Sequence, residues 1–153
     1  MARADHASSS LPRLGCRWRD VKYLLDTDTV SFLLKNHPAV VRNSALHPTD
    51  SWAISAVSAC ELESVRGPRI PHDSWKARID DFLRAIPVVP FGIEDARKAG
   101  EITRYLTEQG LPSGPYDILI AAQALVSGST LVTHNSRHFE NIPLLKLADW
   151  VEK

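Results

Sequence analysis

The sequence lacks several features that would assign it to a specialised class of protein. No apolar run comes near the roughly 18 residues of a membrane-spanning helix, and no internal repeat is visible. Two cysteines among 153 residues do not support a disulfide framework and are typical of the reducing cytoplasm, where we expect the protein to act. Because 18 Lys and Arg balance 18 Asp and Glu, binding to nucleic acid would need a local basic patch.

The first 20 residues differ in composition from the remainder of the chain. They combine Arg, Ser and Pro and contain no continuous apolar region of the kind found in signal peptides. We expect residues 1–20 to form a disordered extension and residues 21–153 to form the folded domain. Two alternatives stay open. Translation could begin at Val21 through a GTG codon, or the arginines of the extension could contact RNA.

From residue 22 onward, short apolar segments alternate with segments of helical periodicity. The predicted strands lie at residues 23–25, 52–55, 88–91, 130–133 and 144–147, and the predicted helices at 30–34, 38–46, 56–66, 72–86, 93–109 and 115–127. Strands that alternate with helices favour a parallel sheet covered on both faces. The fold class is therefore predicted to be α/β.

The segment after the first predicted strand carries the first chemical signal. Asp26 follows this strand, and the polar turn Thr27–Thr29 leads into an apolar helix. In an open α/β sheet the binding crevice lies beyond the carboxyl ends of the strands, so Asp26 is placed to bind a divalent metal ion. Asp28 would be a further ligand or would orient a metal-bound water. The alternative for Asp26 is a structural role as the N-cap of the following helix.

Glu61 carries the second signal, because it lies on the apolar face of a predicted helix. It shares this face with Val57 and Val65, and a carboxylate there is costly unless it is paired or binds a metal ion. Glu63 points to another side and has Arg66 three residues further on, which is an ordinary solvent-exposed pair. We therefore assign a chemical role to Glu61 and a structural role to Glu63.

Asp117 and Asn135 complete the candidate set. Asp117 lies in the first turn of the helix opened by Pro115 and continues its apolar face, although the helix dipole favours an Asp there in any case. Asn135 follows the predicted strand 130–133, so it also lies at a carboxyl end. It is either a site residue or a helix N-cap, and the two roles are compatible.

Three carboxylates at one sheet edge repel one another, and a hard divalent cation offsets that repulsion. Mg²⁺ or Mn²⁺ suits such a site, whereas no His and Cys residues have zinc-like spacing. Such a metal ion supports phosphodiester hydrolysis by polarising phosphoryl oxygens and activating water. Further candidate contacts to phosphate or to metal-bound water are Asp28, Thr133, Ser136, Arg137, His138, Lys35 and Arg66.

Four segments resemble the signature blocks of the PIN-domain ribonucleases, and especially of the VapC-type toxins of bacterial toxin–antitoxin pairs. They are LLDTDTVSFLL, SAVSACELESV, GPYDILIAAQAL and LVTHNSRHFENIPLLKLADW, and the resemblance covers residues 22–150. It implies a three-layer α/β/α fold with a central parallel sheet, endoribonuclease activity, and an acidic site at Asp26, Glu61 and Asp117. The fourth position, often Asp in this family, is Asn135 here, and a neutral amide would bind a second metal ion more weakly.

The resemblance also implies partners. Such toxins usually form homodimers, and a cognate antitoxin inhibits them by laying its C-terminal segment over the acidic groove, often with an Arg among the carboxylates. The amphipathic segment with Trp75, Ile79 and Phe82 is a reasonable place for that partner, although such a face more commonly packs in the core.

Two other functions stay open. Asp26 and Asp28 also match the nucleophile motif of haloacid-dehalogenase-type phosphatases, in which Asp26 would be phosphorylated. That family needs an acidic pair after a late strand, and the late strand here ends in THNSRHF, which has none. The other alternative is a PIN-like module that binds RNA or protein without cutting.

Overall fold

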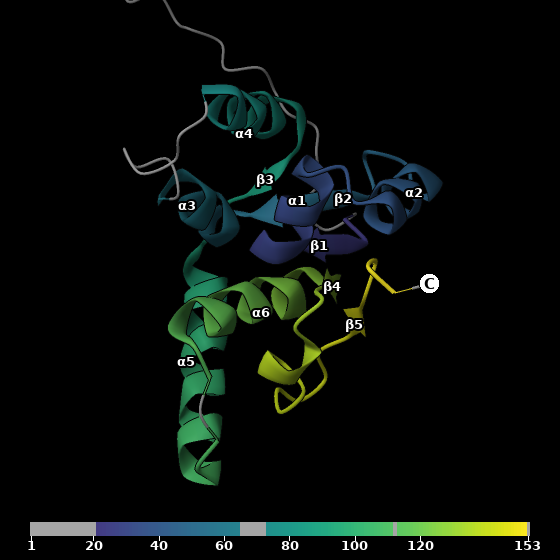
Figure 1. Ribbon diagram of the computed structural model, residues 1–153. Helices are drawn as coiled ribbons and strands as arrows, with labels where there is room; N and C mark the ends of the chain where they lie inside the picture. Colours follow the sequence, from purple (N-terminus) through teal and green to yellow (C-terminus); the bar gives the residue numbers. More distant parts are fainter. Residues whose placement is uncertain (1–20, 65–72, 112, 153) are drawn as a thin grey trace, which may run out of the picture.

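A computed structural model describes residues 21–64, 73–111 and 113–152, which form a parallel sheet with helices on both faces (Figure 1). The strands are β1 (Tyr23–Leu25), β2 (Trp52–Ser55), β3 (Val88–Val89), β4 (Thr130–Val132) and β5 (Leu147–Ala148). The helices are α1 (Thr27–Leu34), α2 (Pro38–Leu46), α3 (Ala56–Ser64), α4 (Asp73–Ala85), α5 (Ile93–Gln109), α6 (Pro115–Ser127) and the short 3-10 helix η2 (Ser136–His138).

The strand order places β1 at the centre of the sheet, with β4 beside it. The order is β3–β2–β1–β4–β5, and all neighbours are parallel. The chain moves from β1 through β2 to β3 in one direction and then returns to place β4 on the other side of β1. The strand order therefore reverses between β1 and β4. Where the order of a parallel sheet reverses, a crevice forms at the carboxyl ends of the strands.

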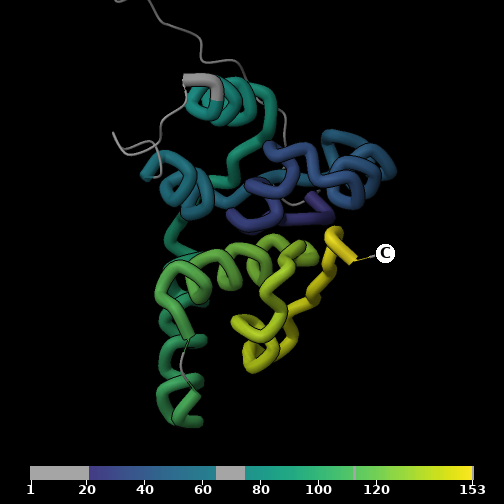
Figure 2. Tube along the Cα trace, in the orientation of Figure 1, coloured from purple at the N-terminus to yellow at the C-terminus, as the bar shows by residue number. Residues whose placement is uncertain are grey.

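Side chains alternate along each strand, so the sheet contributes to a core on each face. Leu24 lies in the same core as Ala53 and Leu131, its partners in register, and this core contains residues of α5 and α6. Leu25 belongs with Ile54 and Val132 to the opposite core, which contains residues of α1, α2 and α4. Figure 2 shows the two helical layers on either side of the strands. The predicted α/β/α architecture is confirmed.

Three of the six predicted helices have the bounds that the sequence predicts. α2, α5 and α6 agree at both ends, and α5 stops at Gly110, whose φ of 65° is the left-handed conformation that ends many helices. α1 begins at Thr27, earlier than predicted, because Asp26 caps it. The predicted extension of α3 to Arg66 and the predicted start of α4 at His72 lie outside the described residues.

Three strand predictions were wrong in their bounds. β4 ends at Val132, one residue before its predicted end at Thr133. β3 ends at Val89, because Pro90 has no N–H to continue the ladder. The last strand is Leu147–Ala148, whereas the sequence predicted 144–147. Leu144 has a φ of 65° and is 92% exposed, so the chain turns there and pairs with β4 only from Leu147 onward.

The amphipathic face of α4 packs in the core. Ile79 is fully buried, and Trp75 and Phe82 pack partly buried against the same cluster as Leu25 and Ile54. This face therefore stabilises the α1–α2–α4 layer and is not a free surface for a partner. None of the helices in the described ranges combines the length and the apolar character that crossing a membrane requires.

Candidate active site

Asp26 lies where β1 ends and α1 begins, and it is held from both sides. Its backbone N–H donates to the carbonyl of Val132 on β4 at 3.0 Å, which ties it to the neighbouring strand. Its carboxylate Oδ1 accepts a 2.8 Å hydrogen bond from the backbone N–H of Thr29, so Asp26 is also the N-cap of α1. The structural role and a place in the site therefore coexist in this residue.

Asp26 is buried, with 6% of its surface exposed, which makes the charged form of its carboxylate unfavourable. Burial raises the pKa of Asp26 above its ordinary value, while hydrogen bonds from Thr133 and Thr29 lower it part of the way back. The negative charge of Asp28 adds to the rise. A cation bound near Asp26 would therefore stabilise the charged form of this carboxylate.

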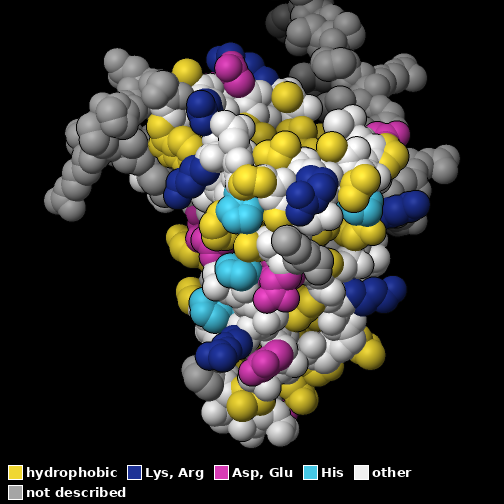
Figure 3. All heavy atoms as spheres, turned by 45° about the vertical axis from the view of Figure 1, so that its right-hand side comes forward, with side chains coloured by type: hydrophobic (Ala, Val, Ile, Leu, Met, Phe, Trp, Pro, Cys, Tyr) yellow, Lys and Arg dark blue, Asp and Glu magenta, His cyan; other side chains and the backbone are white. Residues whose placement is uncertain are grey.

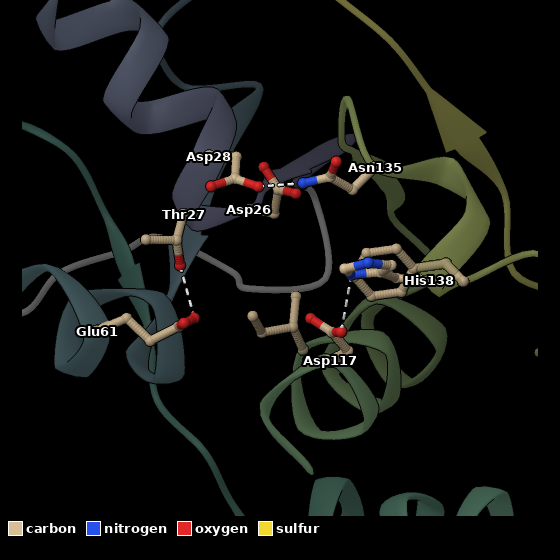
Figure 4. Close-up of a pocket in the computed structure, with 9 residues that line it drawn as sticks. Asp26, Thr27, Asp28, Glu61, Asp117, Asn135 and His138 are labelled. Atoms are coloured by element: carbon tan, nitrogen blue, oxygen red, sulfur yellow. Dashed lines mark hydrogen bonds and ion pairs between the residues drawn. The ribbon is translucent and has the colours of Figure 1, made fainter. Parts of the chain in front are cut away.

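Asp26 lines a pocket at the carboxyl edge of the sheet, and other polar side chains of the pocket come from distant parts of the chain (Figure 4). The pocket is lined by Asp26, Thr27, Asp28, Glu61, Asp117, Ile120, Asn135, His138 and Phe139. All four predicted site residues are thus brought together in one pocket. The sheet topology explains this meeting, because β1, β2 and β4 end at the same edge.

Glu61 extends from α3 into the pocket and is half-buried. Its Oε1 accepts a 2.7 Å hydrogen bond from the hydroxyl of Thr27 in the first turn of α1. Its neighbour Val57 is buried in the core, as the helical spacing predicted. The hydroxyl of Thr27 therefore gives this carboxylate a fixed direction.

Asp117 lies in the first turn of α6, and His138 lies opposite it. The Oδ2 atom of Asp117 is 3.2 Å from Nδ1 of His138. Burial raises the pKa of Asp117, whereas the charge and the hydrogen bond of His138 lower it, and the charge of Asp28 raises it further. A Cβ atom at Gly114 would approach Asp117 Oδ2 to 3.1 Å, so the absence of a side chain there gives the carboxylate room.

Asn135 and Asp28 face each other across the mouth of the pocket. The Asn135 side-chain amide donates a hydrogen bond to Asp28 Oδ2, and it makes no capping bond to η2. The buried hydroxyl of Thr133 accepts from the Asn135 backbone N–H at 3.0 Å and also bonds with Asp26. Thr133 is therefore a positioning residue behind the site rather than part of its lining.

The remaining predicted contacts are spread more widely. Arg137 lines a neighbouring pocket with Ser113, Gly114, Asp117 and His138. Ser136 is exposed and lines neither pocket, and the Lys35 ammonium lies 5.9 Å from the ring centroid of Trp75 on α4. The suggested contact through Arg66 lies outside the described residues.

Sequence reasoning missed three residues of the pocket: Thr27, Ile120 and Phe139. A signal existed for Thr27, because a hydroxyl in the first turn of the helix after Asp26 must lie near the same sheet edge. Ile120 follows Asp117 by three residues and so faces the same side of α6. Nothing in the sequence connects Phe139 to the pocket.

The oxygen donors of the pocket fit a hard divalent cation, because carboxylates, an amide and a hydroxyl line it beside the imidazole of His138. Within the described ranges, no three acidic, His or Cys side chains stand close enough to hold a metal ion together. Glu61, Asp28 and Asp117 instead contact Thr27, Asn135 and His138. Each of these contacts uses one oxygen of the carboxylate, so a metal ion would bind the other oxygen.

Comparison with known proteins decides the family. The family model of the PIN domain matches residues 23–144. The chain belongs to the PIN-domain family. This PIN domain is 32% identical over 130 residues to the tRNA(fMet)-specific endonuclease VapC of Salmonella typhimurium, a match that covers 85% of this chain and 98% of the relative. It is 34% identical over 131 residues to the protein of the same name from Shigella flexneri, with the same coverage.

A solved structure agrees with the family assignment. The crystal structure of DNA-bound VapBC from Salmonella typhimurium matches this PIN domain with a TM-score of 0.78 and 32% identity, covering 85% of this chain and 98% of the other. PIN-domain nucleases of the VapC group generally depend on a divalent metal ion. The match to a PIN domain removes the phosphatase alternative, since the Asp26–Asp28 motif lies on this fold.

Proposed function

We propose that this PIN domain is an endoribonuclease, the toxin of a toxin–antitoxin pair, and that it hydrolyses RNA phosphodiester bonds at the acidic pocket. The observation that carries the proposal is the meeting of Asp26, Glu61 and Asp117 in one pocket at the carboxyl edge of the sheet. The similarity to VapC endonucleases over almost their whole length supports RNA as the substrate class.

Mg²⁺ or Mn²⁺ is the metal ion that this donor set would bind, through Asp26, Glu61 and Asp117. When bound, it would polarise the phosphoryl group and lower the pKa of the attacking water. The raised pKa values of Asp26 and Asp117 support this assignment, because they reflect buried negative charge that a cation would stabilise. With the amide of Asn135 in place of a fourth carboxylate, we expect one tightly bound ion.

The protein's own residues would place the substrate. Asp28 and Asn135, which bond to each other, lie at the mouth of the pocket, where they can orient a water or a ribose hydroxyl. The neighbouring pocket shares Asp117 and His138 with the acidic one and adds Arg137. An exposed guanidinium at this place would bind the phosphate of an adjacent nucleotide.

The partners of this PIN domain follow from the same likeness. The similarity to the VapBC complex supports a cognate antitoxin here. A cationic side chain of that antitoxin would be attracted to the acidic pocket and would block it. We further propose a homodimer and action in the cytoplasm, where RNA and antitoxin are both present.

The test is cleavage of bulk RNA by the full-length chain with Mg²⁺ or Mn²⁺, with and without EDTA. Asp117→Asn and Glu61→Gln should each abolish cleavage, because each removes a charge from the pocket. Glu63→Gln is the matched control, since it changes the same residue type two positions away on α3 and should cleave like the wild type. Cleavage that persists in both site variants would overturn the proposed site.

The outcome without cleavage is also informative. If the wild type does not cleave bulk RNA, purified tRNA(fMet) is the next substrate, as suggested by the names of the relatives. Metal binding without hydrolysis of either RNA would favour the module that binds without cutting. Cleavage that EDTA does not stop would contradict the metal-dependent mechanism.

A further inference from the structure

Histidine side chains gather on one face of the molecule (Figure 3), and two of the histidines contact the ring of Phe32. The ring of Phe32 on α1 makes edge contacts with His37 at 5.3 Å and with His134 at 5.8 Å, measured between ring centroids. Of these three rings, that of His134 is the most accessible to a ligand, because 41% of its side-chain surface is exposed. Neither His37 nor Phe32 is exposed to that degree.

The His134 ring is held in one orientation, which is unusual for an exposed side chain. Its Nδ1 atom bonds to Asp149 Oδ2 at 2.9 Å. The second oxygen of Asp149 accepts from the backbone N–H of Val151 at 2.8 Å, so the carboxylate is itself anchored. Phe32 meets the imidazole at an interplanar angle of 89°. A ring fixed on two sides loses little conformational entropy when a ligand stacks on it.

The position of His134 connects it to the site. It lies between Thr133, which bonds with Asp26, and Asn135, which bonds with Asp28. Phe32 lies on α1, whose first residue follows Asp26 directly. The backbone of His134 therefore lies beside the acidic pocket, and its imidazole, which is not part of the pocket lining, packs outside it against α1. The pocket with Arg137 opens on the other side, next to α6.

We propose that the imidazole of His134 is a stacking platform for an unpaired RNA base next to the scissile phosphate. This inference rests on the proposed ribonuclease function and names how that site selects its substrate. Single-stranded RNA is commonly bound by stacking its splayed bases on aromatic side chains. A strand that crosses the acidic pocket from Arg137 would bring a base onto His134, so the site would prefer unpaired RNA to a duplex.

The test measures binding, not only activity. In the full-length Asp117→Asn background, the probes are short single-stranded RNAs in which 2-aminopurine replaces one base at a time, in the presence of Mg²⁺. Stacking quenches 2-aminopurine fluorescence, so we expect quenching at one position. His134→Ala should remove this quenching and weaken binding by about 5- to 100-fold, the range that base–aromatic stacking implies.

Two variants separate stacking from other roles of His134. His134→Phe keeps the ring face and loses the bond to Asp149, and it should retain both quenching and most of the binding. His47→Ala is the matched control, because His47 also stacks on an aromatic ring, Trp150, but precedes β2 at the other end of the strands. It should bind RNA like the parent. Thermal unfolding of each variant shows whether the fold is kept.

The outcomes distinguish this inference from the function on which it rests. If the wild type cleaves RNA and His134→Ala binds it normally, only the stacking platform is overturned. The same holds if His134→Phe loses as much binding as His134→Ala, because the ring face would then not be what binds. If the wild type cleaves no RNA and the Asp117→Asn background binds none, both proposals are overturned.

Discussion

The hydroxyl of Thr27 donates a 2.7 Å hydrogen bond to the carboxylate of Glu61, 34 residues further along the chain. The bond joins the first turn of α1 to α3 across the mouth of the acidic pocket (Figure 4). Glu61 is half-buried, and without this partner its long side chain could turn toward solvent. Thr27 therefore positions a carboxylate that lines the acidic pocket.

Removing this hydroxyl should impair cleavage more than stability. Thr27→Val keeps the shape of the side chain and removes the donor, so Glu61 would lose its fixed direction. We expect cleavage to fall by about 10- to 100-fold, as is common when a group that orients a metal ligand is lost, with a small change in thermal unfolding. Thr27→Ser restores the hydroxyl and should recover most of the activity, and failure to recover would contradict the positioning role.

Asp26→Asn should stabilise the metal-free protein while abolishing cleavage. The amide can still accept the capping bond from the Thr29 N–H, and it removes a buried charge whose pKa is raised by burial. We expect a gain of roughly 1 kcal/mol in the free energy of unfolding at neutral pH, as when a strained active site is relaxed. Denaturant unfolding in EDTA measures it, with exposed Asp50→Asn as the control.

The same gain should depend on pH in a defined direction. Because the pKa of Asp26 is raised on folding, the native protein binds a proton at a higher pH than the unfolded chain does. The wild type therefore gains stability as the pH falls through that raised pKa toward the ordinary value for Asp. The advantage of Asp26→Asn should shrink over this range, and an advantage that grows on acidification would contradict the burial argument.

Asn135→Asp should strengthen metal binding at a cost in stability. The new carboxylate would face Asp28, whose oxygen now accepts from the Asn135 amide, so two negative charges would replace a hydrogen bond. Repulsion should lower the melting temperature without metal, and Mn²⁺ should restore it. A Mn²⁺ titration measures the affinity, with the exposed Asn141→Asp as the control; equal affinity in both variants would argue against a metal near residue 135.

Gln123→Leu should destabilise the fold without touching the pocket. The buried Gln123 amide accepts from the Ser55 hydroxyl and donates to the carbonyls of Val89 and Pro90 at 3.1 Å each, so it joins α6 to the ends of β2 and β3. Leu would leave these groups without a partner, and each buried unsatisfied group costs roughly 1–3 kcal/mol. Denaturant unfolding should show a loss in this range or above, whereas exposed Gln109→Leu should have little effect.

The sequence predicted the elements well where local signals were strong. Pro38 and Pro115 begin α2 and α6, and Gly110 ends α5, because these residues restrict or permit the backbone by themselves. The last strand was misplaced because the apolar run that begins at Leu144 looks extended. Its first residue is turned outward in the left-handed conformation, and only pairing with β4 determines where the strand begins.

For the site, the sequence by itself determined which residues are acidic and that each lies near the end of a strand or on the inner face of a helix. The tertiary structure alone decided their partners: Thr27 for Glu61, His138 for Asp117 and Asn135 for Asp28. Local propensity acts over a few residues, whereas these pairs are separated by 21 to 107 positions, from His138 minus Asp117 to Asn135 minus Asp28. The strand order, which places β1 between β2 and β4, brings side chains from the segments after these strands within hydrogen-bond distance.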